Sequence, residues 1–165
     1  MIFLIGALFT VLVGTAELYL CRRFGASKRF SVLLPANRSI WEQLKVIVWP
    51  MVIFSVAEYF NYGTYFENFI AAKAVSVLFA MIWNIMLSYI FDSVWGKRSF
   101  ALDVCITALS SATGWAANYA LVKNYCLSSQ FEKVSGTAVI LALMLCFALF
   151  TFTVPQKSIF REREM

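Results

Sequence analysis

Five long apolar runs constrain the fold of this chain more than any other feature. Each run is close to the roughly 20 residues that an α-helix needs to cross about 30 Å of hydrocarbon. Apolar residues make up 61% of the 165 residues and charged residues 14%, against about 45–50% and about 25% in soluble domains. The sequence therefore predicts an all-α membrane protein, folded as one integral-membrane domain: a bundle of five transmembrane helices.

The expected helices are separated by charged or turn-forming residues. No basic residue precedes the first run and Arg22 and Arg23 follow it, which favours a retained helix over a cleaved signal peptide. Ser39 and Glu42 have the spacing of a capping box, so the second helix is expected to begin at Ser39 and to kink at Pro50. The predicted helices cover residues 2–21, 39–62, 71–91, 101–122 and 134–153.

Basic residues predict the orientation of this bundle. Residues 22–45, 93–100 and 155–165 together carry eleven of the fourteen Lys and Arg residues. Because basic loops are retained in the cytoplasm, we expect a multi-pass protein of the plasma membrane with its N-terminus outside and its C-terminus in the cytoplasm. Anionic lipid headgroups at the cytoplasmic face then account for the net charge of +5, and no nucleic-acid partner is expected.

The residue types that carry most enzyme chemistry are absent or scattered. The chain has no histidine, which removes Ser/His and Cys/His nucleophile pairs and the commonest metal ligand. Its four cysteines contain no C-x-x-C pair, which argues against a disulfide framework or a zinc site. We therefore expect no catalytic residue, no metal and no cofactor, although membrane chemistry based on carboxylates alone stays open.

Polar residues recur at helical spacing in the third and fourth apolar runs. Residues three or four positions apart share one face of a helix, so each run predicts a polar stripe, and two facing stripes predict a polar seam. The seam either packs the helices through small residues and hydrogen bonds or lines a path or pocket for a solute. The run at 101–122 is the most polar, so a re-entrant or surface segment is its alternative. The stripes contain Ser76, Asn84, Ser88 and Asp92, and Asp103, Thr107, Ser110, Gly114 and Asn118.

Ionisable groups at membrane depth each need a partner or a function, because they cost at least about 2.5–3.5 kcal/mol at a helix centre. In the first run, Gly6, Thr10 and Gly14 form a ladder for close packing, and Glu17 continues the same face. Ion pairs at the helix ends are one explanation for the acidic residues, and a vestibule for a cation or polar solute is the other. The candidate substrate-binding residues are Glu17, Asn84, Asp92, Asp103, Ser110 and Asn118.

A motif before the second helix carries a resemblance. Its residues are Asn37, Ser39, Trp41, Glu42 and Lys45, followed by a Trp-Pro pair. With it the chain resembles an uncharacterised family of small bacterial integral-membrane proteins with the motif N-x-S-[VTI]-W-E-H-L-K. The likeness extends to Glu58-Tyr59, Asn68-Phe69, Ala72-Lys73, Asp103 and Phe152-Thr-x-x-Pro155. The resemblance implies the architecture and no function.

The chain departs from this family pattern in places that matter chemically, including the tail, where Arg161-Glu-Arg-Glu replaces a final acidic-proline element. Gln43 stands where the family tends to have His, and Glu17 falls near a second family His. The motif also has a physical interpretation, in which Ser39 and Glu42 cap the helix, Trp41 anchors at the interface and Lys45 extends toward the headgroups. Contact with a cytoplasmic partner is the alternative.

Two functions remain in competition. The first is a subunit that binds or transports a small solute or ion through the seam between the third and fourth helices. The second is a non-catalytic scaffold or accessory subunit that presents the basic 22–45 loop to a partner or to anionic lipid. A homo-oligomer is also expected to be possible, with the glycine ladder packing against another copy.

Overall fold

In a computed structural model, residues 2–24, 34–35, 39–96, 99–124, 130–153 and 159 are described. They form five α-helices and one 3-10 turn, with no strand among the described residues: α1 (Ile2–Phe24), α2 (Ile40–Asn61), η1 (Gly63–Tyr65), α3 (Phe69–Trp95), α4 (Phe100–Lys123) and α5 (Gln130–Phe152). All five α-helices are long and apolar enough to cross a membrane, including the polar α4. The predicted all-helical fold is confirmed, with the helix ends displaced by at most four residues.

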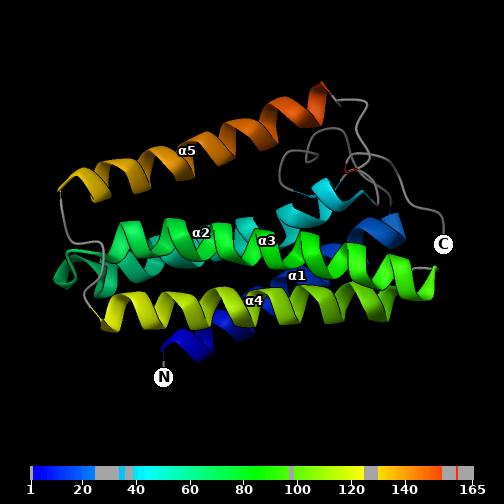
Figure 1. Cartoon of the computed structure of the whole chain (residues 1–165), viewed down its shortest axis with the longest axis horizontal. Coiled ribbons are helices and arrows are strands. Elements are labelled where there is room, and N and C mark those ends of the chain that lie inside the picture. The colour runs from blue at the N-terminus through cyan, green and yellow to red at the C-terminus, as the bar shows by residue number, and fades with distance from the viewer. Residues whose placement is uncertain are drawn as a thin grey trace.

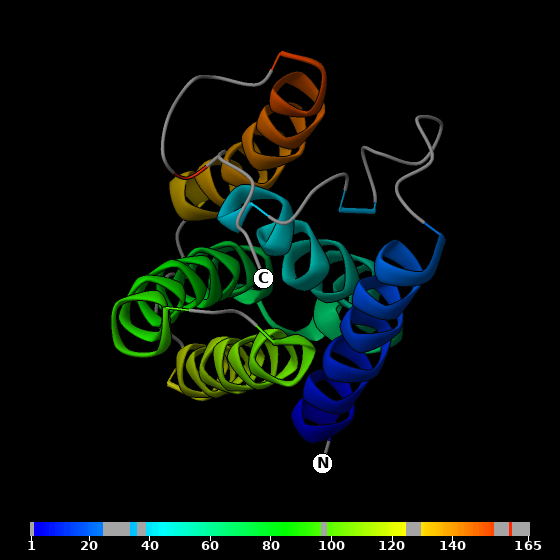
Figure 2. The ribbon, with the colours of Figure 1, turned by 90° about the vertical axis from the view of Figure 1, so that its right-hand side faces the viewer.

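The five helices run up and down along one long axis (Figure 1). We call the end at which α2 joins α3 the α2–α3 end, and the end at which α1 stops and α2 starts the α1–α2 end. Viewed along the axis, α1 to α4 pack around one another, whereas α5 lies on the outside (Figure 2). The interior of α1 to α4 is therefore the place where a polar seam would be enclosed.

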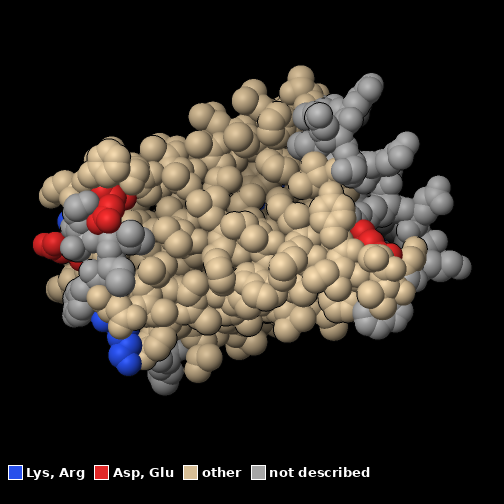
Figure 3. Space-filling view, in the orientation of Figure 1, with Lys and Arg blue, Asp and Glu red and all other residues tan. Residues whose placement is uncertain are grey.

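On the face of the bundle that Figure 3 shows, the charged side chains of the described residues lie at the two ends. Figure 3 shows a broad band without Lys, Arg, Asp or Glu between these ends. Large apolar side chains are exposed along the helices, among them Leu8 and Leu12 of α1, Ile82 of α3 and Leu145 of α5, each at least 60% exposed. An apolar surface of this extent is unfavourable in water and suits a bilayer.

Two glycines let α1 approach its neighbours closely. A Cβ added at Gly14 would lie 2.8 Å from the Val46 carbonyl oxygen of α2, and one at Gly6 would lie 2.4 Å from the Trp115 ring of α4. The predicted close packing of this ladder is confirmed, and its neighbours belong to the same chain. A second copy would therefore have to use a different surface.

The start of α2 follows the expected capping. The Ser39 hydroxyl accepts a hydrogen bond from the Glu42 backbone N–H at 3.2 Å, as the capping-box spacing predicts. Pro50 lies inside the continuous helix, and the kink there stays a prediction. This cap determines where α2, the most enclosed of the five helices, begins.

We expect Gly14→Leu to destabilise the docking of α1. Its side chain has no room beside the Val46 carbonyl, and overpacking of this kind costs about 1–3 kcal/mol. The measurement is the unfolding midpoint of the purified protein in detergent. Ala16→Leu is the matched control, because Ala16 is exposed on the opposite side of the same helix. Equal midpoints for the two variants would contradict the packing of this face.

Candidate functional site

Polar side chains line the interior that α1, α2, α3 and α4 enclose, from one end of the bundle to the other. They come from all four helices, although each helix is apolar enough to cross a membrane. We call this set the polar column. Its members are Thr10, Glu17, Gln43, Glu58, Lys73, Asn84, Ser88, Thr107, Ser110, Ser111, Trp115 and Asn118.

A buried ion pair lies in the part of the column nearest the α2–α3 end. The Lys73 ammonium of α3 contacts one oxygen of the Glu58 carboxylate of α2, and both residues are at most 3% exposed. Tyr62, just beyond α2, donates its phenolic hydrogen to the other carboxylate oxygen. Burial and the adjoining Glu58 raise the pKa of the Tyr62 phenol, so it remains a donor throughout the physiological pH range.

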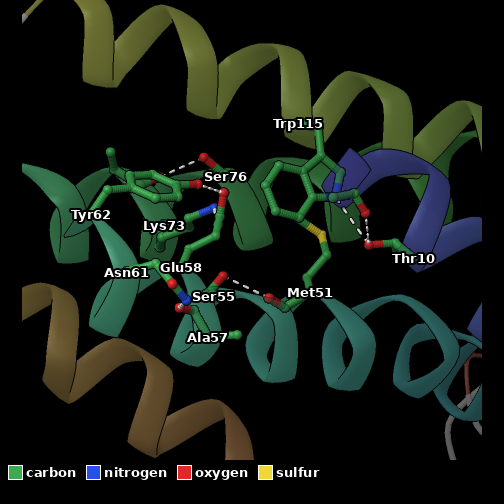
Figure 4. A network of polar contacts seen from close by, with 12 residues as sticks. Thr10, Met51, Ser55, Ala57, Glu58, Asn61, Tyr62, Lys73, Ser76 and Trp115 are labelled. Atoms are coloured by element: carbon green, nitrogen blue, oxygen red, sulfur yellow. Dashed lines mark hydrogen bonds and ion pairs between the residues drawn. The ribbon is translucent and has the colours of Figure 1, made fainter. Parts of the chain in front are cut away.

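The same ammonium also links α3 to α4 and α1. It lies 3.9 Å from the centroid of the Trp115 ring, a distance typical of a cation–π contact. The indole N–H of Trp115 donates to the Thr10 hydroxyl at 3.0 Å, and that hydroxyl donates to the Gly6 carbonyl at 2.8 Å. Figure 4 shows this succession, in which one ammonium joins four helices.

Other side chains of the column have polar atoms without hydrogen-bond partners among the described residues. Both amide atoms of Asn84 and of Asn118 have no partner among the described residues, and both residues are fully buried. The same is true of three hydroxyl groups of α4, which belong to Thr107, Ser110 and Ser111. A buried polar group left in this state costs about 1–3 kcal/mol.

Helix register places Asn84 beside these hydroxyl groups. A Cβ added at Gly114 would lie 2.7 Å from Ala80, which shows where the antiparallel α3 and α4 meet. Moving one turn along α3, from Ala80 to Asn84, corresponds to moving one turn back along α4, from Gly114 to about Ser110. The unpartnered amide and the unpartnered hydroxyls therefore occupy one level of the seam.

At the α1–α2 end the column contains the Gln43 amide. The Gln43 side chain donates to the Asp103 carbonyl at 3.5 Å and accepts from the Ser88 hydroxyl at 3.4 Å, both long for hydrogen bonds. Glu17 lies one turn from Gly14, which touches Val46, so it reaches the level of Gln43. One Glu17 carboxylate oxygen is buried without a partner among the described residues. The Glu17 and Gln43 side chains thus lie at the same level of the column.

The structure separates the residues proposed from sequence into two groups. Glu17, Asn84, Ser110 and Asn118 belong to the column. Asp92 and Asp103 lie at the α1–α2 end, partly exposed, and each has interactions there. Neither aspartate side chain is a member of the column. Asp103 contacts the column through its backbone carbonyl, which accepts a hydrogen bond from the Gln43 amide.

The motif at the start of α2 differs from expectation at Lys45. Its ammonium is fully buried and bonds to the Glu42 carboxylate at 2.7 Å and to the Thr151 hydroxyl of α5 at 2.7 Å. The prediction that Lys45 extends toward headgroups is wrong, because a carboxylate one turn away neutralises the ammonium in place. Trp41 packs on Phe147 of α5, with ring centroids 4.9 Å apart, and Asn37 lies outside the described residues.

Sequence reasoning missed the ion pair in the column. In the sequence, Glu58 and Lys73 fall near the ends of the second and third apolar runs, where interfacial ion pairs or hydrogen bonds are expected without a partner being named for either. A signal was present, because Lys45 and Lys73 are the two basic residues within the predicted helices 2–21, 39–62, 71–91, 101–122 and 134–153. Buried cations in membrane helices pair with buried anions, which would have predicted both contacts.

We expect the Glu58–Lys73 pair to be strongly coupled in a double-mutant cycle. Glu58→Gln or Lys73→Met alone leaves a buried charge without its partner, which costs about 3–5 kcal/mol. The double variant removes both charges, so its loss of stability should be well below the sum of the single losses. Unfolding in detergent provides the measurement. Additive losses would show that the two side chains act independently.

Comparison with known proteins identifies a family for this chain. No curated protein and no solved structure matches this chain significantly. A family model described as "Family of unknown function (DUF6512)" matches residues 1–164, nearly the whole of the sequence. The chain therefore belongs to this family of unknown function.

Proposed function

We propose that this chain binds a small polar solute or a cation in the polar column and passes it along the seam between α3 and α4. In this proposal the chain lies in the plasma membrane with the start of α1 outside, as the distribution of basic residues favours. Glu17 stands at the cytoplasmic side of the seam. The Glu58–Lys73 pair stands at the external side.

The observation that carries the proposal is the unpartnered state of Asn84. Asparagine and hydroxyl groups that only join membrane helices bond to one another across the interface. Here the Asn84 amide and the neighbouring hydroxyls are fully buried and have no partners among the described residues. These groups are free to coordinate a bound species. Its hydrogen bonds would offset the free-energy cost of burying the groups without partners.

The donor set indicates the chemistry of that species. It consists of amide and hydroxyl groups with a single carboxylate, from Glu17. Among the described residues no three His, Cys, Asp or Glu side chains come together. Sites for divalent cations usually combine several carboxylates, so a monovalent cation or a neutral polar solute fits this set better.

The alternative of a scaffold that presents the 22–45 loop has less support. Glu42 and Lys45 are buried and bonded to each other and to α5, so they are not available to a partner. Trp41 is half-buried against α5. The part of the motif that the structure describes therefore stabilises the bundle.

The test combines flux with stability in Asn84→Leu. Purified protein is reconstituted in liposomes, ²²Na⁺ uptake and proton flux are measured, and binding of small amides and polyols is followed by thermal shift. We expect the wild type to respond to one of these probes and Asn84→Leu to lose at least about 90% of that response. Because leucine removes an unsatisfied amide, the unfolding midpoint should stay equal or rise.

Met86→Leu is the matched control, since Met86 is exposed on the same helix two residues away. It should leave both measurements unchanged. A wild-type protein that responds to none of the probes would overturn the proposal. An Asn84→Leu variant that keeps full flux, or that unfolds more easily without losing flux, would assign Asn84 to helix packing.

A further inference from the structure

An apolar layer crosses the polar column at the point where α3 and α4 meet. A Cβ added at Gly114 of α4 would lie 2.7 Å from the Ala80 methyl of α3 and 3.3 Å from the terminal methyl of Met51 of α2. The ring of Trp115, the next residue of α4, lies against Gly6 of α1. All five residues are buried, and we call them the apolar layer. Each of the four enclosing helices therefore contributes an apolar group at this level.

Polar groups without partners among the described residues lie on both sides of the apolar layer. On α4, Asn118 is one turn from Gly114 toward the α2–α3 end, and Ser110 is one turn from it toward the α1–α2 end. Both are fully buried, and neither the Asn118 amide nor the Ser110 hydroxyl has a hydrogen-bond partner in the described part of the chain. The apolar layer therefore divides the column into an Asn118 side and a Ser110 side.

The Trp115 ring makes up most of the bulk of the apolar layer. Trp115 is the largest buried side chain in the part of the chain that the structure describes. The other members are two glycines, an alanine and Met51, whose unbranched side chain adapts its shape easily. The ring is therefore the group that a molecule passing along the column has to displace.

Two polar contacts hold the Trp115 ring in place. Its indole N–H donates to the Thr10 hydroxyl at 3.0 Å, and its face lies 3.9 Å from the Lys73 ammonium. Figure 4 shows the ring between these two partners. Phe54 of α2 packs on the same ring in a T-shaped arrangement, with centroids 5.5 Å apart. Because a displaced ring loses both polar contacts, its position depends on Thr10 and Lys73.

We infer that Trp115 is the gate of the seam. Its ring separates the Asn118 side of the column from the Ser110 side, and a solute passes when the ring moves away from Thr10 and Lys73. The gate rests on the proposed passage of a solute along the seam, and it identifies the side chain that controls this passage. The Glu58–Lys73 pair then has a second role, because it fixes the ammonium on which the ring lies.

The test measures from which face of the membrane each side of the column is reached. The four native cysteines are replaced by alanine, and Ser110→Cys or Asn118→Cys is introduced into this background. Right-side-out and inside-out membrane vesicles are treated with the impermeant thiol reagent MTSET. We expect the two variants to react in opposite vesicle types, each at least about tenfold faster in one type than in the other.

Variants of the gate should abolish this sidedness. Trp115→Ala removes the ring, so both introduced cysteines should react in both vesicle types. Thr10→Val removes the acceptor of the indole N–H and keeps the shape of the side chain, so it should raise the slower rate at least about tenfold. Thr10→Ser keeps the hydroxyl and should preserve the sidedness. If Trp115→Ala does not fold, the comparison of the two Thr10 variants decides.

Leu109→Ala is the control for a change on the same helix, since Leu109 is 50% exposed on the outside of α4. It should leave both labelling rates unchanged. In the background with Trp115 intact, introduced cysteines that react from the same face, from both faces or from neither would overturn the gate. Unchanged sidedness in both Trp115→Ala and Thr10→Val would show that another part of the protein closes the column.

The labelling needs no transported solute, so it separates the gate from the proposed function. The expected sidedness in a protein that responds to none of the flux and binding probes would support the gate and remove the proposed transport of those probes. Solute flux through a protein whose two introduced cysteines react from both faces would support transport and overturn the gate.

Discussion

A buried ammonium in a membrane-spanning helix has to be neutralised where it lies, because neither water nor lipid tails can solvate it. In this chain that requirement joins four helices at Lys73. Glu58 of α2 supplies the charge, Trp115 of α4 supplies the ring face, and the Trp115 indole N–H reaches Thr10 of α1. The close approach at Gly6, where α1 lies against the same ring, follows from this arrangement. Removal of any member leaves a polar group in an apolar interior.

The fifth helix, α5, is attached through a second buried ammonium, which is also neutralised by a carboxylate. Lys45, neutralised by Glu42, donates to Thr151, and the adjoining Trp41 packs on Phe147. Near its start α5 is in contact through Gly136, and Gly136 and Phe147 are its fully buried positions. A helix attached near its two ends leaves space along its middle. An apolar groove opens there between α2, α3 and α5, lined by Val56, Val77 and Ile140 among others.

The limits of prediction from this sequence have physical causes. The five helices follow from hydropathy, because a run of about 20 apolar residues has one stable form in a bilayer. The stripe from Thr107 to Asn118 follows from helical periodicity, and all of its polar members are buried. Helical periodicity predicts on which face of a helix a side chain lies, but not which residue of another helix it contacts. Lys45 was therefore expected at the surface, since nothing in the sequence shows that Thr151, 106 positions away, lies next to it.

The column therefore contains two kinds of buried polar group, those with partners and those without partners among the described residues. Lys73, Glu58, Trp115 and Thr10 are bonded to one another, so each is explained by the stability of the bundle. Asn84, Ser110 and Asn118 lie a turn or two away and have no partners among the described residues, so the same explanation fails for them. A chain under selection for stability alone would have apolar residues there, since these are cheaper to bury. Polar groups that weaken a fold persist where function requires them. The contrast with their satisfied neighbours is the reason we propose the seam, more than the ion pair, as the place where this protein acts on another molecule.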